Sequence, residues 1–356
     1  MKTNKLLLVA VTGLGRGENP QPGAAVIASL RRQWPDLSIA GLVYDAMESG
    51  IYGPSSPDAA FTLPYPSCHR GVLLSRIDEI REEFPFEILI PTLDAEMEPF
   101  LAIREDLEER GIRTMLPDHR AMTSRSKQHL ARLAETAGVR IPRTYVVHDA
   151  EEAAERTAEM QCTVMIKGPY YEAYRANSPL LARVHARRIL AEWGGPIIVQ
   201  EYLEGDEFDV LAVGDGAGRV LGSCAVRKLV VSSQGKGYAG ITVEDPKLTS
   251  AAEALMQALK WGGPLELEFL RTRDGVFHLI EINPRFPAWS DFPAALGCNL
   301  GAIALQSLLG QRPASLAPIP PGKIFLRHNV DMVCDSLEFG TLATEGRVIR
   351  KPRAVV

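Results

Sequence analysis

A short acidic stretch in the last third of the sequence restricts the fold more than any other feature. Residues 265–269 alternate apolar and acidic side chains, and residues 276–282 form a second, largely apolar run. Asp274-Gly275, a dipeptide typical of tight turns, separates the two runs. The pattern therefore predicts a β-hairpin whose side chains alternate between two faces.

The period of two assigns the polar residues of this hairpin to faces. Along its second strand it places four residues on one face: Phe277, Leu279, Glu281 and Asn283. The expected register brings Glu268 close to Glu281 and Asn283. Carboxylate and amide oxygens are ligands that Mg²⁺ accepts and shares with substrate phosphates, and Arg285 adds a planar donor fork for phosphate or carboxylate. The alternative is a surface hairpin whose acidic side chains lie on its solvent-exposed face.

The first 118 residues show the pattern of a doubly wound α/β domain. Residues 5–11 form an apolar run typical of a buried parallel strand, followed by a glycine-rich turn and a helical pattern over 24–34. Gly13, Gly15 and Gly17 are spaced Gly-x-Gly-x-Gly, and the helix starts late, after two prolines. We therefore favour a tight turn facing a cleft, and a nicotinamide dinucleotide site is the alternative. Asp94 and Glu96 follow another buried strand and are expected to cap the next helix, with substrate contact as the alternative.

Two lysines and an acidic linker form a second group of candidates. Lys167 ends an apolar strand, where its ammonium needs a partner such as a phosphate. Lys127 lies in a helical segment over 117–138, and an exposed helix lysine is the alternative there. Glu201, Leu203 and Glu207 lie in or beside a linker between two apolar strands, for which a loop of solvated acids is the alternative. Residues 222–231 form a further strand, which contains Arg227 and Lys228.

Taken together, these residues resemble the ATP-grasp superfamily, which includes carbamoyl-phosphate synthase, biotin carboxylase and many carboxylate–amine ligases. The resemblance is carried by Glu281-Ile-Asn283-Pro-Arg285 with Glu268 one strand earlier. It implies a nucleotide site, a site for Mg²⁺ or alternatively Mn²⁺, and a set of catalytic cations. The residues implied for ATP are Lys127, Lys167, Glu201, Leu203 and Glu207, and those implied for the metal are Glu268, Glu281 and Asn283. The implied catalytic cations are Arg285, Arg227 and Lys228. The loop 169–178 departs from the family's glycine-rich form, and its tyrosines are candidates for contact with the acceptor substrate.

The resemblance also implies a fold and a reaction. The expected fold is α/β, with a Rossmann-like pre-ATP-grasp domain (1–118) followed by two α+β subdomains that clamp ATP (119–205 and 206–356). The expected reaction converts a carboxylate into an acyl phosphate and joins it to an amine, such as an amino acid or small peptide. The alternatives are a bicarbonate-activating enzyme of the carbamoyl-phosphate or carboxylase type and a non-catalytic ATP-binding protein.

The amino-acid composition limits which binding partners and which cellular compartment the protein is expected to have. The formal net charge is -5, from 39 basic and 44 acidic residues, which gives no reason to expect nucleic acid as a partner. The run at residues 6–11 is too short to cross a membrane. Five dispersed cysteines argue against a disulfide framework and a zinc site. We therefore expect a cytoplasmic protein without membrane contact that acts on small molecules, and a homodimer is the family-level expectation.

Overall fold

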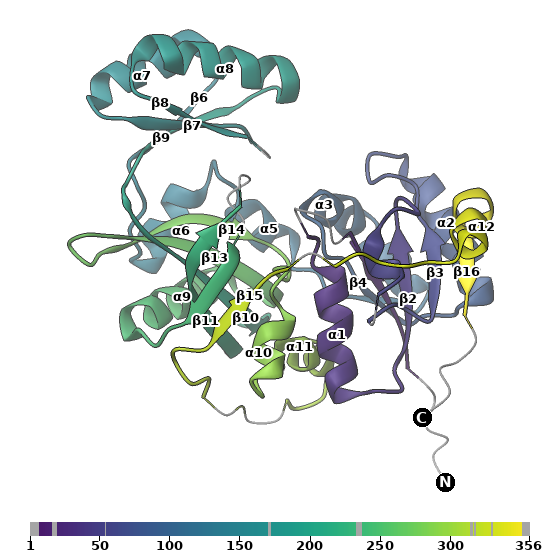
Figure 1. Ribbon diagram of the computed structural model, residues 1–356. Coiled ribbons are helices and arrows are strands. Elements are labelled where there is room, and N and C mark those ends of the chain that lie inside the picture. The colour runs from purple at the N-terminus through teal and green to yellow at the C-terminus, as the bar shows by residue number, and fades with distance from the viewer. Residues whose placement is uncertain are drawn as a thin grey trace.

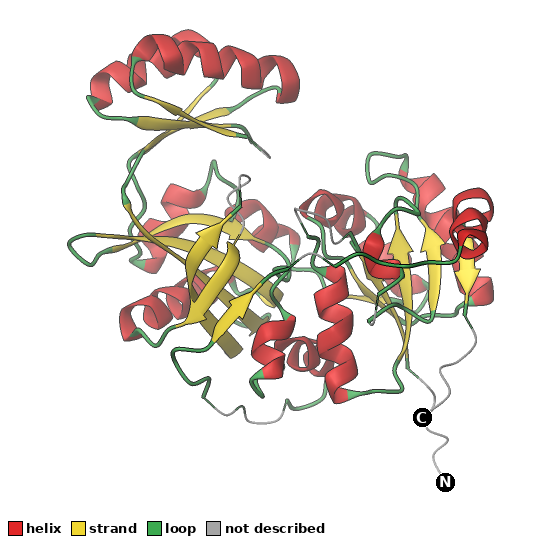
Figure 2. Cartoon of the chain, viewed as in Figure 1, coloured by secondary structure: helices red, strands yellow, loops and turns green. Residues whose placement is uncertain are grey.

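The chain folds around three β-sheets (Figure 1). The computed structural model describes residues 7–15, 20–53, 55–169, 172–232, 237–313, 316, 318–328 and 330–350. Figure 2 shows helices flanking each of these sheets. The mixture of one largely parallel sheet with two antiparallel sheets confirms the predicted α/β class.

The first sheet has the order β16-β3-β2-β1-β4-β5, and β1 to β5 are parallel. Its elements from the first part of the chain are β1 (Leu8–Thr12), α1 (Gly23–Gln33), β2 (Ser38–Val43), the 3₁₀ turn η1 (Ser49–Ile51), β3 (Ala59–Thr62), α2 (Arg70–Glu83), β4 (Ile88–Ile90), α3 (Asp94–Ala102), α4 (Arg104–Glu109) and β5 (Arg113–Thr114). Val9, Ala10 and Val11 of β1 are fully buried, because helices cover both faces of the sheet. The predicted doubly wound domain is therefore present.

The second sheet is a separate antiparallel unit with the order β6-β9-β7-β8. Its elements are β6 (Thr144–Val147), α7 (Ala150–Met160), β7 (Val164–Lys167), β8 (Ala173–Ala176), α8 (Pro179–Trp193) and β9 (Ile197–Glu201). Both helices lie on one side of this sheet, and the unit stands apart from the rest of the chain in Figure 1. Its buried residues, among them Val147, Ile166 and Ile189, form a core of their own.

The third sheet is antiparallel, with the order β14-β13-β10-β11-β12-β15. It contains β10 (Gly205–Asp215), β11 (Val220–Val231), β12 (Gly237–Thr242), β13 (Gly262–Thr272), β14 (Phe277–Asn283) and β15 (Ile324–Leu326), and the helices α9 (Pro246–Leu259), α10 (Asp291–Ala295) and α11 (Leu300–Leu308) belong to the same part of the chain. α5 (His119–Ser124) and α6 (Leu130–Ala137) also pack here, on α9. One hydrophobic cluster joins Phe100 of the first domain to Leu255 and Leu267, so these two parts share a core.

The end of the described chain returns to the first sheet. We expected residues 206–356 to form one subdomain, but α12 (Ser336–Glu345) leads into β16 (Arg347–Ile349), which pairs antiparallel with β3. Residues 336–350 therefore lie with the amino-terminal domain in space. A three-residue strand carries no sequence signal for the sheet edge that it joins, because pairing partners are chosen by tertiary contact.

Candidate active site

The predicted hairpin is present, but its second strand contains a β-bulge. Glu268 pairs with Glu281 and Phe269 pairs with Leu279, which leaves Ile280 as the extra residue of β14. A bulge reverses the alternation of faces, so Leu279 and Ile282 are both buried in the core. The expectation that Phe277, Leu279, Glu281 and Asn283 share one face was therefore wrong. The sequence did not reveal the bulge, because Leu279 and Ile280 are adjacent apolar residues and only the structure shows which of them is buried.

The bulge places two acids and an amide together. Asn283 donates from Nδ2 to Glu268 Oε1 at 2.7 Å, and Lys127 Nζ lies 3.1 Å from Glu281 Oε1. Directly opposed carboxylates repel each other, and cations beside both of them offset that cost. The donor chemistry fits a hard divalent cation. Among the described residues no three His, Cys, Asp or Glu side chains form a metal cluster, so the amide oxygen of Asn283 would have to complete the set.

Lys228 is the central cation of the site. Its Nζ lies 2.9 Å from Glu268, 3.1 Å from Asp209 and 3.3 Å from Glu207. Its side chain is 5% exposed. Burial by itself would lower the pKa of Lys228, but the charges of Glu268 and Asp209 raise it overall. Glu207 and Asp209 both contact Lys228, because alternation along β10 places them on one face.

The two lysines predicted for the nucleotide face the same cluster from different elements. Lys167 Nζ donates to Gln200 Oε1 at 2.7 Å in the four-stranded unit. Its pKa is lowered by burial, with Glu281 acting in the opposite direction and Lys127 in the same one. Lys127 lies in the turn between α5 and α6 and not inside a helix. The ammonium of Lys127 thus contacts Glu281, and the ammonium of Lys167 is near enough for the charge of Glu281 to act on its pKa.

Three predicted residues do not join this cluster. Glu201 Oε2 lies 3.1 Å from Nε of Arg143, a contact that lowers the pKa of Glu201. Leu203 lies in the irregular linker between β9 and β10. Arg227 lies 3.7 Å from Asp206, away from its neighbour Lys228, because consecutive strand residues point to opposite faces. The position of Arg227 does not support a catalytic role.

Arg285 is held by two acids that belong to different domains. Its Nε donates to Asp94 Oδ2 at 2.9 Å, and its Nη1 donates to Glu266 Oε2 at 2.8 Å. Burial by itself would lower the pKa of Arg285, but both acids raise it. Asp94 was expected to cap a helix; it is instead the first residue of α3, with its carboxylate on Arg285. The capping expectation holds for Glu96, which accepts from the backbone N–H of Leu93.

Sequence reasoning missed two residues of this region. Glu266 belongs to the same alternating strand as Glu268, so its position facing the site was open to prediction. Arg125 had no signal beyond its closeness to Lys127 in the chain. It donates from Nη1 to the carbonyl oxygen of Ile282 at 3.1 Å, and burial lowers its pKa.

The glycine-rich turn after β1 is a packing feature in its described part. Gly13 has φ +66°, and a Cβ there would lie 2.4 Å from Thr92 Oγ1 at the end of β4. The backbone N–H of Leu14 donates to Glu48 at 2.7 Å. The third glycine, Gly17, lies outside the described residues, as do Tyr170 and Tyr171 of the tyrosine-rich loop.

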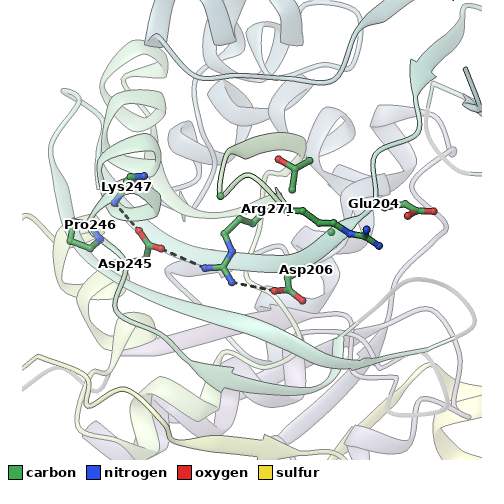
Figure 3. Close-up of a pocket in the computed structure, with 10 residues that line it drawn as sticks. Glu204, Asp206, Asp245, Pro246, Lys247 and Arg271 are labelled. Carbon is green, nitrogen blue, oxygen red and sulfur yellow. Dashed lines mark hydrogen bonds and ion pairs between the residues drawn. The ribbon is translucent and has the colours of Figure 1, made fainter. Parts of the chain in front are cut away.

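A described cavity lies elsewhere, away from these residues. It has a volume of about 770 Å³ and is lined where β10 begins and β13 ends (Figure 3). Arg271 there pairs with Asp206 at 3.2 Å and with Asp245 at 3.9 Å. No residue that the sequence predicted for the site lines this cavity. We therefore do not identify it with the active site.

Comparisons with known proteins agree with this arrangement. Residues 195–327 match the family described as ATP-grasp in the biosynthetic pathway with Ter operon. Residues 195–327 are therefore similar to an ATP-grasp domain, and the fold of the chain agrees with that similarity. Among curated proteins, the chain is 28% identical over 157 residues to the carbamoyl phosphate synthase arginine-specific large chain of Lactiplantibacillus plantarum. That match covers 40% of this chain and 15% of the relative, so the chain spans only a small part of that protein.

Solved structures share the fold over most of the chain. A biotin carboxylase–β,γ-ATP complex from Campylobacter jejuni superposes with a TM-score of 0.69 and 17% identity, covering 86% of this chain and 72% of that one. L-amino acid ligase from Bacillus licheniformis has a TM-score of 0.61 and 15% identity, covering 86% and 75%. In the part of the chain that the structure describes, no helix is long and apolar enough to span a membrane.

Proposed function

We propose that the chain is an ATP-dependent ligase that activates a carboxylate and joins it to an amine. The observation that carries the proposal is the register of the hairpin, which sets Glu268 opposite Glu281 with Asn283 beside them. Lys127, and Lys167 from another element, are close to the same acids. Two carboxylates, an amide and several cations around one point suit the transfer of a phosphoryl group by positioning and charge neutralisation.

Each cluster then has a role. Glu268, Glu281 and Asn283 would hold Mg²⁺, which supplies neutralisation of the nucleotide's phosphate charge when bound. Lys127 and Lys167 would bind phosphate oxygens, and Glu207 would accept from the ribose hydroxyls. Arg285 would orient the carboxylate substrate. The carboxylate oxygen attacks the γ-phosphorus and ADP leaves, giving an acyl phosphate. The amine nitrogen then attacks the acyl carbon, loses a proton and expels phosphate.

The substrates are proposed from the relatives alone. The likeness to L-amino acid ligase supports an amino acid or small peptide as the amine. The likeness to carbamoyl phosphate synthase and biotin carboxylase favours bicarbonate as the alternative carboxylate. Cytoplasmic location and homodimerisation stay predictions.

The first experiment is phosphorus NMR of Mg-ATP with the protein and pooled carboxylates and amino acids. We expect ADP and phosphate to appear only with a particular pool. AMP and pyrophosphate would show adenylation and contradict the acyl-phosphate mechanism. ATP consumption with bicarbonate alone would favour the alternative, and tight ATP binding without turnover in any pool would favour a binding role.

Substitution of Glu281 tests the metal assignment. We expect Glu281→Gln to reduce ADP formation by roughly 100-fold or more, because an amide offers one neutral oxygen where the carboxylate offers a charged pair. The control is Glu253→Gln, which changes an exposed acid of α9 and should leave the rate unchanged. Circular dichroism verifies that both variants fold. A folded Glu281→Gln protein with the wild-type rate would contradict the proposed metal site.

A further inference from the structure

Glu266 is a buried acid that no proposed catalytic role uses. Its side chain is 7% exposed, and its Oε1 accepts from Nε1 of Trp289 at 3.0 Å. Its Oε2 accepts from Nδ2 of Asn283 at 3.1 Å and from Nη1 of Arg285 at 2.8 Å. One carboxylate therefore contacts both a proposed metal ligand and the guanidinium proposed to hold the substrate.

The contact with Asn283 decides which end of the amide is available. An ionised carboxylate only accepts hydrogen bonds, so the amide must present its NH₂ group to it. The two hydrogens of Nδ2 are directed to Glu266 and Glu268. The amide oxygen is then the atom left to bind a cation. Without Glu266, the amide would lose one of the two acceptors that set this orientation.

The contact with Arg285 fixes a second group in the same way. Asp94 occupies Nε and Glu266 occupies Nη1, so the guanidinium is held from two sides in one plane. Its side chain is 12% exposed. Asp94 contacts the arginine, whereas Glu266 contacts both the arginine and the asparagine.

We propose that Glu266 is a positioning residue that orients the Asn283 amide for the metal and the Arg285 guanidinium for the carboxylate, which couples the two subsites. The inference rests on the proposed function. Replacing an acid that hydrogen-bonds to a metal ligand, without binding the metal itself, typically weakens metal affinity by about 10- to 100-fold. A purely structural role for Glu266 would change stability and leave metal affinity intact.

The test measures Mn²⁺ binding to the full chain by electron paramagnetic resonance, with a non-hydrolysable ATP analogue present. We expect Glu266→Gln to weaken Mn²⁺ binding by about 10- to 100-fold, because the glutamine lacks the charge and one acceptor. Asp94→Asn, the matched control, removes only the other acid on Arg285 and should bind Mn²⁺ within about twofold of wild type. In the turnover assay both variants should raise KM for the carboxylate.

The outcomes separate the inference from the proposed function. A folded Glu266→Gln protein that binds Mn²⁺ like wild type would overturn the inference and leave the ligase proposal standing. Wild-type protein that binds no Mn²⁺ with the nucleotide would overturn both. If Glu266→Gln does not fold, Glu266→Asp replaces it, because aspartate keeps the buried charge but is too short to reach both partners. We expect Glu266→Asp to weaken Mn²⁺ binding as well. Unchanged Mn²⁺ affinity in that variant would also overturn the inference.

Discussion

Burial and pairing shift the pKa values of two neighbouring acids of the site, Asp209 and Glu268, in opposite directions. Burial raises the pKa of Asp209 well above its usual range, and the charge of Lys228 opposes the shift only in part. Burial also acts on Glu268, but there Lys228 and Asn283 lower the pKa overall. The two acids contact the same ammonium but differ, because the charges of Glu268 and Glu266 also raise the pKa of Asp209, whereas Asn283 and Arg285 lower the pKa of Glu268. The charge of Glu268 is the one that the proposed metal site needs.

Glu96 gives the residue-scale prediction of pH dependence. It is fully buried and accepts hydrogen bonds from Thr12, Tyr44 and the backbone N–H groups of Thr92 and Leu93. Burial raises its pKa to about 7 against these hydrogen bonds. A raised folded-state pKa means that the folded state binds the proton more tightly. The stabilisation is therefore complete below about pH 4.5 and is lost as the pH rises through 7.

We expect Glu96→Gln, which cannot ionise, to remove this dependence. The free energy of unfolding of wild type should fall relative to the variant by up to about 3 kcal/mol between pH 4.5 and 8. Urea denaturation of both proteins across that range measures the difference. Parallel pH profiles for the two proteins would contradict the raised pKa of Glu96.

At the scale of elements, the hairpin of β13 and β14 organises the site. Its turn contains Gly275 at φ +80°, a backbone conformation that residues other than glycine and asparagine seldom adopt. The bulge at Ile280 then shifts the register by one residue, which moves Glu281 and Asn283 to the face that carries Glu268. The turn and the bulge thus determine which side chains meet.

We expect Gly275→Ala to destabilise the protein by about 1–2 kcal/mol, because alanine is strained at positive φ. No atom lies within 4 Å of the position of the added Cβ, so steric collision does not contribute. Gly275→Asn is the matched control and should cost less, since asparagine tolerates this region. Urea denaturation provides both values, and equal losses in the two variants would contradict the strain argument.

At the scale of the whole molecule, the cores show which parts pack together. The first and third sheets share hydrophobic clusters, whereas the four-stranded unit has its own core. Lys167 belongs to that unit, and its proposed phosphate contact would therefore join the unit to the hairpin. After the third sheet, α12 and β16 return the chain to the edge of the first sheet.

Substitution of Arg350 tests how strongly α12 and β16 are held against the first sheet. Arg350 donates to the carbonyl oxygens of Pro57 at 2.7 Å and Ile51 at 2.9 Å, and it pairs with Glu338. We expect Arg350→Ala to lower the free energy of unfolding by about 1–3 kcal/mol, since the partly buried carbonyls lose their donor. Arg347→Ala removes a more exposed pair with Glu83 and should cost less than about 1 kcal/mol. Equal effects would show that the Arg350 contacts do not hold the return.

The sequence by itself determined the elements and the chemistry that they carry. Continuous apolar runs predicted the buried parallel strands, and alternation with Asp274-Gly275 predicted the hairpin, because these signals depend on neighbours in the chain. Glu268, Glu281, Asn283 and Arg285 followed from the same stretch. Only the tertiary structure decided that Asp94 meets Arg285 and that β16 joins β3. Those contacts join residues far apart in sequence, and their free energy comes from burial and charge pairing, which leave no local pattern to detect.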